Sequence, residues 1–184
     1  VMLEKSYGQH LGIADEEYKN SGVILQNSAE QVLEKADILL RVNCLSNNEI
    51  NIIKNKSIII GQFDPQIDKE KINKLIKKEI NIFSLNLLPR ITRAQSMDVL
   101  SSQANLAGYK AVIESVKEFD KAIPMMMTAA GTVTPAKVLI IGAGVAGLQA
   151  IATAKRLGGI VSATDVRAAA KEQVESLGGK FLSV

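Results

Sequence analysis

Short apolar runs alternate with polar, helix-compatible segments in the first half of the chain. The apolar runs are Val23–Leu25, Ile38–Val42, Ser57–Ile60 and Ile80–Phe83. The segments between them are Ala29–Ala36, Asn47–Ile53 and Asp68–Lys78. Strands that alternate with helices are typical of an α/β domain with a mainly parallel sheet. Residues 1–95 are therefore predicted to form such a domain. Val1–Glu4 resembles the tail of a strand, so we expect this domain to lack its start.

The last helix of this domain carries its own start signal. Asp68 is a suitable N-cap, and Ile72, Leu75 and Ile76 then fall on one face of the helix. This face is predicted to pack against the sheet.

A long helix is predicted from about Gln95 to Phe119. Residues at three- and four-residue spacing suit one helical face, namely Met97, Leu100, Ala104, Ala107 and Ala111. Small side chains on this helix, namely Ala104, Ala107, Gly108 and Ala111, suit close packing across an interdomain or intersubunit seam, although an ordinary core helix explains the same pattern at least as well. Pro124 ends the segment. We assign residues 96–123 to this connecting helix.

The remaining residues, 124–184, repeat the strand and helix alternation. The predicted strands are Val138–Ile141, Ile160–Thr164 and Phe181–Leu182, and the predicted helices are Val145–Leu157 and Ala168–Leu177. Each helix stops at a glycine, as a left-handed C-terminal cap requires. The sequence thus predicts an α/β protein of two Rossmann-like domains with mainly parallel sheets, joined by a long helix. We expect both domains to be truncated, the second to the first half of a dinucleotide fold.

Composition narrows the possible functions. The 184 residues are 47% hydrophobic, and the net charge of +3 is scattered rather than concentrated in a basic block. With seven aromatic residues, nucleic-acid binding has little support. No stretch approaches the roughly 18 apolar residues of a membrane span. One cysteine, Cys44, excludes an internal disulfide, and with a single histidine it makes no Cys/His metal cluster. His10 lies in a loop-like stretch and is predicted to be exposed or to pack rather than to catalyse.

The loop Gly142–Gly147 joins a predicted buried strand to a predicted helix and has the spacing G-x-G-x-x-G. Gly142 permits the tight turn, Gly144 lets the backbone approach a pyrophosphate, and Gly147 lets the helix pack closely on the strand. The helix N-terminus offers unpaired N–H groups and a positive dipole to the phosphates. A turn of this kind that binds no ligand is the alternative.

Asp165 closes the next strand, 18 positions after the last glycine of the loop. A carboxylate at this place accepts hydrogen bonds from the adenosine ribose and repels a 2′-phosphate, which favours NAD(H) over NADP(H). Arg167 could pair with such a phosphate, but an exposed arginine that opens a helix is the favoured interpretation.

A second polar cluster, Arg90–Asp98, follows a predicted strand. Asp98 could pair with Arg90 or Arg93, and Gln95 can both donate to and accept from a carboxamide such as that of nicotinamide. For the cluster taken alone, a helix cap with a surface ion pair is the favoured interpretation. A dehydrogenase commonly uses a histidine or a lysine as its base, and the single histidine lies in an unpromising place. Direct hydride passage between two nicotinamides needs no such base.

Several runs resemble the α subunits of proton-translocating NAD(P) transhydrogenases. They are Arg90–Tyr109, Met127–Val133, Gly144–Ala150, Ala163–Arg167 and Lys171–Gly179. The resemblance implies a soluble NAD(H)-binding component that forms a homodimer and docks with an NADP(H)-binding component carried by a membrane domain. It further implies a peripheral position on the cytoplasmic face of the inner membrane, or in the matrix of a mitochondrion. Hydride would pass directly between the nicotinamides, with no catalytic side chain and no metal.

The resemblance also assigns cofactor-binding residues. The nicotinamide end of NAD(H) would be held by Arg90, Ile91, Thr92, Arg93, Gln95, Asp98 and Ser101. The rest of the dinucleotide would be held by Gly142, Ala143, Gly144, Val145, Gly147, Asp165, Val166 and Arg167.

Two other functions stay open at this stage. Alanine dehydrogenases share the architecture, but they use a histidine and a lysine at the substrate centre, and Ile58–Pro65 contains no histidine where one would be expected. The second open function is that of a non-enzymatic module that senses NAD(H). Because half of the nucleotide fold and a mobile loop of the family lie outside these residues, we expect the 184-residue chain alone to bind NAD(H) weakly or not at all and to be inactive.

Overall fold

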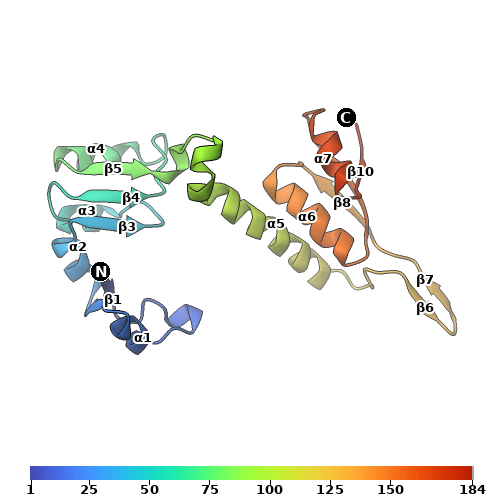
Figure 1. The fold of residues 1–184 in the computed structure, drawn as a ribbon, viewed down its shortest axis with the longest axis horizontal. Helices are drawn as coiled ribbons and strands as arrows, with labels where there is room; N and C mark the ends of the chain where they lie inside the picture. Colours follow the sequence, from blue (N-terminus) through green and yellow to red (C-terminus); the bar gives the residue numbers. More distant parts are fainter. Residues whose placement is uncertain (184) are drawn as a thin grey trace. The chain divides into compact units, whose positions relative to one another are not determined.

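The computed structural model describes residues 1–183 and divides the chain into two compact units, Val1–Met97 and a second that begins at Asp98 (Figure 1). The helix expected to connect two domains belongs to the second unit. Val184, the last residue of the predicted second domain, lies outside the described residues.

Parallel strands form the first unit, as the alternating pattern predicted. Its strands are β1 (Met2–Glu4), β2 (Ile24–Gln26), β3 (Ile38–Arg41), β4 (Ile58–Gly61) and β5 (Asn81–Ser84). Its helices are α1 (Asp15–Asn20), α2 (Ala29–Lys35), α3 (Asn47–Ile52) and α4 (Lys69–Lys77). Strands β1 and β2 make a two-stranded parallel sheet, and β3, β4 and β5 make a three-stranded one in that order. Helix α1 and a 3-10 helix at Gln9–Leu11 had no counterpart in the prediction.

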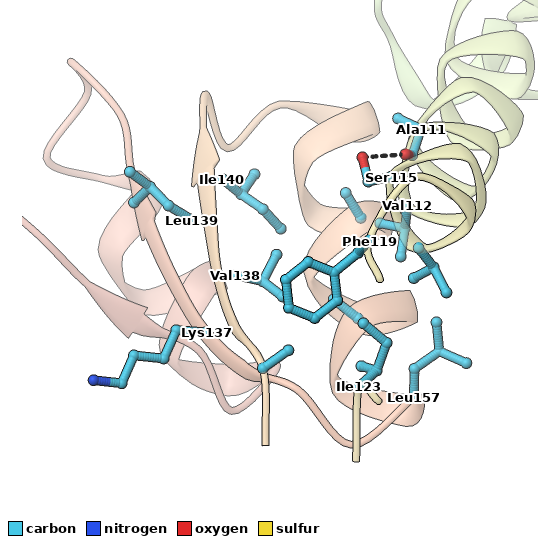
Figure 2. Close-up of a pocket in the computed structure, with 14 residues that line it drawn as sticks. Ala111, Val112, Ser115, Phe119, Ile123, Lys137, Val138, Leu139, Ile140 and Leu157 are labelled. Carbon is cyan, nitrogen blue, oxygen red and sulfur yellow. Dashed lines mark hydrogen bonds between the residues drawn. The ribbon is translucent and has the colours of Figure 1, made fainter. Parts of the chain in front are cut away.

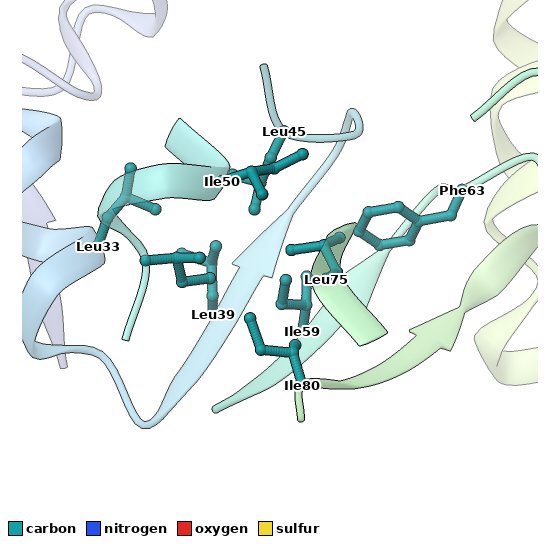
Figure 3. Packing of buried hydrophobic residues seen from close by; sticks show 9 residues of the cluster. Leu33, Leu39, Leu45, Ile50, Ile59, Phe63, Leu75 and Ile80 are labelled. Atoms are coloured by element: carbon teal, nitrogen blue, oxygen red, sulfur yellow. The ribbon is translucent and has the colours of Figure 1, made fainter. Parts of the chain in front are cut away.

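One face of the β3–β4–β5 sheet carries the core of the first unit (Figure 3). Leu39 and Ile59 are register partners on β3 and β4, and both are buried. Helices α2, α3 and α4 add Leu33, Ile50 and Leu75 to the same cluster. These buried side chains come from the strands and helices that the sequence predicted.

The opposite face of that sheet is apolar but exposed. Ile38, Leu40 and Phe83 are 58%, 73% and 58% exposed. Because successive strand residues point to opposite faces, these side chains alternate with the buried ones along β3 and β5.

Helix α3 is fixed at both ends by side chains. At its start, Ser46 and Glu49 form a capping box, in which each side chain accepts a hydrogen bond from the other residue's backbone N–H. At its end, Lys78 Nζ donates to three carbonyl oxygens, of Ile50 and Asn51 at 2.8 Å and of Ile53 at 2.9 Å. A cation at this position satisfies carbonyls that have no helical partner and favours the negative end of the dipole.

Helix α4 departs from its prediction in two details. Asp68 occupies the N-cap position, but its side chain accepts from the backbone N–H of Asp64 at 3.1 Å and makes no cap bond. Leu75 is buried, whereas Ile76 is 58% exposed, so the predicted apolar face is narrower than expected.

The second unit contains a hairpin and a parallel sheet. Strands β6 (Met126–Thr128) and β7 (Gly131–Val133) pair antiparallel in an exposed hairpin that the sequence did not predict. Strands β8 (Lys137–Ile141), β9 (Ile160–Thr164) and β10 (Lys180–Phe181) form a parallel sheet in the order β10, β9, β8. Its helices are α5 (Val99–Lys117), α6 (Val145–Arg156) and α7 (Ala170–Ser176). Gly158 and Gly178 adopt left-handed conformations after α6 and α7, as predicted.

The start and the buried face of α5 differ from the prediction. Thr92–Met97 is a 3-10 helix, so Gln95 precedes α5 and Asp98 is its N-cap rather than a member of its first turn. Gly108, one of the predicted small residues, is buried together with Val112, whereas the predicted Ala107 and Ala111 are exposed. A Cβ on Gly108 would lie 2.0 Å from the carbonyl oxygen of Ala146, so α5 packs closely on α6 inside the second unit (Figure 1).

None of the helices in the described residues is both long and apolar enough to cross a membrane.

Candidate dinucleotide site

The glycine loop between β8 and α6 has the conformation that its three glycines were predicted to allow. Gly142 has φ +97°, a value that L side chains rarely adopt, and its N–H donates to Thr164 O on β9 at 2.8 Å. A Cβ on Gly147 would lie 1.8 Å from Gly142 O. Around Gly144, in contrast, no atom beyond the two adjacent residues lies within 4 Å of the Cβ position. The loop is thus tightly packed at its third glycine and open at its second.

This open position lies at the N-terminus of α6. Gly144 is the N-cap residue in an extended conformation, and the bond from Leu148 N–H to Gly144 O, at 2.8 Å, closes the first turn. The first N–H groups of a helix have no helical acceptor, and they carry the positive end of the dipole. An open, backbone-lined helix start of this kind fits a pyrophosphate group.

Asp165 lies beside the loop, directly after β9. Its side chain is 7% exposed. Its Oδ2 accepts from the backbone N–H of Ala143 at 2.7 Å, so the carboxylate is bonded to the glycine loop itself. Arg167 donates to both oxygens, through Nε at 2.9 Å and Nη2 at 3.1 Å, and its backbone N–H donates at 2.8 Å. These bonds, led by that of the Arg167 side chain, hold the pKa of Asp165 well below its usual range.

Two features at this site were missed from the sequence. Arg167 is exposed and precedes α7, as predicted, but it is also the ion-pair partner of Asp165. The hydroxyl of Thr164 is buried and has no hydrogen-bond partner among residues 1–183. The place of Asp165 after a strand indicated the site from the sequence alone. Its ion pair with Arg167 could not be predicted, because it depends on the conformation of the turn between the two residues. Val166, between the two charged residues, is 96% exposed.

The other predicted site residues fall in both units. Arg90, Ile91, Thr92, Arg93 and Gln95 lie at the end of the first unit and are all exposed, whereas Ala94 among them is buried. In the second unit, Asp98 caps α5 by accepting from Ser101 N at 2.9 Å and from Ser101 Oγ at 2.6 Å. The helix cap that the sequence offered as an alternative is therefore present. The pairing of Asp98 with Arg90 or Arg93 stays a prediction.

The residues considered for other chemistry lie elsewhere. His10 is exposed in the 3-10 helix that precedes α1, in keeping with its predicted role. Cys44 is partly buried, and burial, with a smaller effect of Asp68, raises the pKa of its thiol. A thiol in such a place is less nucleophilic than an exposed one.

A cavity of about 420 Å³ lies in the second unit, away from the glycine loop (Figure 2). Its walls are largely apolar and include Val112, Phe119, Val138 and Leu157. The hydroxyl of Ser115 in its wall already donates to a carbonyl of α5, that of Ala111, at 2.8 Å. Because its lining offers few polar groups to a phosphate or a ribose, this cavity is a poorer candidate for a dinucleotide than the glycine loop.

Comparison with known families decides the relationship of the chain. The family model described as alanine dehydrogenase/PNT, N-terminal domain, matches residues 1–107, and that of the C-terminal domain matches residues 111–184. The chain belongs to the alanine dehydrogenase/PNT family.

Within the alanine dehydrogenase/PNT family, the chain is similar to proteins named as transhydrogenase subunits. It is 49% identical to a protein of Rhodospirillum rubrum named as the first part of NAD(P) transhydrogenase subunit alpha, over all of this chain and 49% of that protein. It is 42% identical to NAD(P) transhydrogenase subunit alpha of Haemophilus influenzae, over all of this chain and 36% of that protein. The chain thus spans half or less of the length of these relatives.

Solved structures of the alanine dehydrogenase/PNT family agree with the fold. The transhydrogenase from Sinorhizobium meliloti superimposes with a TM-score of 0.92 at 52% identity, over 99% of this chain and 54% of that one. An L-alanine dehydrogenase superimposes with a TM-score of 0.80 at 20% identity, over all of this chain and 52% of that one, which is a likeness of fold alone. The predicted Rossmann-like α/β class is confirmed.

Proposed function

We propose that the chain is the NAD(H)-binding part of a proton-translocating NAD(P) transhydrogenase, in which NAD(H) supplies or accepts the hydride exchanged with NADP(H) on a partner component. The observation that carries the proposal is the glycine loop, open at Gly144, with Asp165 bonded to it through Ala143. The 49% identity to a transhydrogenase subunit supports this function over others of the same fold.

Each end of the dinucleotide has its own residues in this proposal. The N-terminus of α6, with Gly144, Val145 and Gly147, binds the pyrophosphate through backbone N–H groups, and Gly142 forms the tight turn that presents them. Asp165, with Ala143, Val166 and Arg167 around it, binds the adenosine ribose, and its charge disfavours a 2′-phosphate. By their match to the family motif, Arg90, Ile91, Thr92, Arg93, Gln95, Asp98 and Ser101 bind the nicotinamide end.

No side chain has to move a proton in this function. Direct transfer requires two nicotinamide rings held close and aligned, so the task of the protein is positioning and exclusion of water. His10, which is exposed, has no role in the proposed transfer.

The proposal includes partners and a place in the cell. The complete protein forms a homodimer, binds an NADP(H)-carrying component, and lies on the cytoplasmic side of the inner membrane through a membrane component. Light scattering of the complete protein tests the homodimer. The mass of a monomer at micromolar concentration would contradict it.

Hydride exchange tests the proposed function. The complete protein, mixed with the NADP(H)-binding component of a transhydrogenase, should transfer hydride from NADH to an NADP analogue, followed by absorbance. The complete protein alone should give no exchange. Absence of exchange with both components folded, and with NADH bound, would overturn the assignment.

An alanine dehydrogenase activity is a second candidate because of the shared fold. It predicts NADH formation from alanine and NAD⁺ by the complete protein without a partner. The segment Ile58–Pro65, where those enzymes have a histidine, contains none. We therefore expect no alanine-dependent NADH formation.

A further inference from the structure

The carboxylate of Asp165 has all its acceptor positions in use. Oδ1 accepts from Arg167 N and Nε, at 2.8 and 2.9 Å, and Oδ2 accepts from Ala143 N and Arg167 Nη2, at 2.7 and 3.1 Å. An ionised carboxylate offers about four lone-pair positions. A ribose hydroxyl therefore has no free position on Asp165 in this conformation.

The four donors differ in how readily they can leave. Two are backbone N–H groups, fixed by the glycine loop and by the turn after β9. The other two belong to the Arg167 side chain, which is 62% exposed. Water solvates the exposed guanidinium when it leaves, whereas the nearly buried carboxylate must then accept from another donor, which a ribose hydroxyl supplies. The guanidinium is thus the donor that another group can displace.

We propose, on the basis of the proposed function, that Arg167 competes with the adenosine ribose for Asp165. Without nucleotide, the Arg167 guanidinium caps the carboxylate and satisfies oxygens that are nearly buried. When the ribose binds, Nε and Nη2 leave, and the ribose hydroxyls donate to the vacated positions. The backbone N–H groups of Ala143 and Arg167 stay in place and keep the carboxylate oriented.

Two other roles of Arg167 make different predictions. An arginine that remains on Asp165 as a permanent support is needed for ribose binding, so its removal weakens binding. An arginine that contacts the nucleotide phosphate is also needed, but its removal weakens the binding of any nucleotide, with or without ribose hydroxyls. Competition alone predicts that removal strengthens binding, and only for a nucleotide that has the hydroxyls.

The test compares AMP with 2′,3′-dideoxy-AMP, which lacks both hydroxyls. Dissociation constants are measured by calorimetry for the complete wild-type protein, for Arg167→Met, and for Arg156→Met, which removes an exposed arginine from the opposite end of α6. In Arg167→Met the preference for AMP over the dideoxy nucleotide should rise about two- to fivefold. In Arg156→Met it should not change. An unchanged or smaller preference in Arg167→Met would overturn the competition.

A second measurement needs no variant. In NMR spectra of the wild-type protein, the Arg167 Nε–H signal should lose its hydrogen-bonded shift when AMP saturates the site, but not with the dideoxy nucleotide. An Nε–H signal that keeps its shift with AMP bound would also overturn the competition.

Asp165→Ala separates this inference from the proposed function. If it removes the preference for AMP while Arg167→Met leaves the preference at the wild-type value, Asp165 is the ribose acceptor and only the competition is wrong. If the wild-type protein shows no preference for AMP, and Asp165→Ala changes nothing, both the competition and the assigned ribose site are wrong.

Discussion

A methyl group on Gly147 would lie 1.8 Å from the carbonyl oxygen of Gly142, across the turn that joins β8 to α6. The two glycines therefore hold the start of the helix against the end of the strand. Gly144 lies between them, and no atom beyond its adjacent residues lies within 4 Å of its Cβ position. One loop thus contains a packing glycine and an open one, and these can be tested separately.

Gly147→Ala should destabilise the second unit. The added Cβ forces the helix and the loop apart, at a cost of about 1–3 kcal/mol in the free energy of unfolding. Gly144→Ala is the matched variant, because its Cβ points into open space, and it should cost less than about 1 kcal/mol. Urea unfolding followed by circular dichroism measures both. Equal costs for the two alanines would contradict the packing described.

Lys78→Met should destabilise the first unit although the residue is not in the core. It removes the three hydrogen bonds to the C-terminal carbonyls of α3. Because the donor is charged, the loss of these bonds should lower the free energy of unfolding by about 1–3 kcal/mol. The exposed neighbour Lys77, changed to Met, should alter stability by no more than about 0.5 kcal/mol. The account of the α3 terminus fails if the two variants unfold at the same urea concentration.

The sign of the stability change in Gly108→Ala distinguishes packing from helix propensity. In a helix without neighbours, alanine in place of glycine stabilises by about 1 kcal/mol. Because its Cβ would lie 2.0 Å from Ala146 O, we expect Gly108→Ala to destabilise by about 1–3 kcal/mol instead. A thermal melt gives the sign directly, with the exposed Asn105→Ala on the same helix as the reference. A raised melting temperature for Gly108→Ala would rule out the close α5–α6 contact.

Asp165 should make the stability of the second unit depend on pH. Its pKa is lowered by Arg167 and by two backbone N–H groups, so the ionised form is favoured in the folded state. Such a group contributes stability that is fully present above its unfolded pKa of about 4 and is lost as the pH falls through the folded value. The difference in urea midpoint between wild type and Asp165→Asn should be constant from pH 8 to 6 and shrink below about pH 4. A difference that grows on acidification would contradict this sign.

The regular elements followed closely from the sequence because strand and helix periods are local properties. Strand β9 was predicted at its observed bounds, and α6 to within one residue. The hairpin of Met126–Thr128 and Gly131–Val133 was missed because its exposed, short strands carry no alternation of apolar and polar residues.

The predicted small-residue face of α5 included Gly108, which is buried, together with Ala107 and Ala111, which are exposed. Alanine and glycine contribute little hydrophobic contrast, so spacing alone did not separate Ala107 from Gly108. Position 108 requires glycine because the backbone of Ala146, on helix α6, lies against it. This contact cannot be recognised from the sequence of α5 alone.

The residues of the candidate site could be predicted from the sequence, but the hydrogen bonds between them could not. The spacing of Gly142, Gly144 and Gly147 and the place of Asp165 follow from the strand, loop and helix order. The capping of Asp165 by Arg167 depends on the conformation of a three-residue turn, for which the sequence offered two interpretations of Arg167 and neither was this one.

The affinities of the complete protein for NADH and NADPH test the central claim most directly. Titration followed by nicotinamide fluorescence should show tighter binding of NADH than of NADPH, and Asp165→Ala should lower the NADH affinity about tenfold or more. The same variant should reduce the difference in affinity between NADH and NADPH. Equal affinities in the wild-type protein, or an NADH affinity unchanged by Asp165→Ala, would contradict the assignment of this loop as an NAD(H) site.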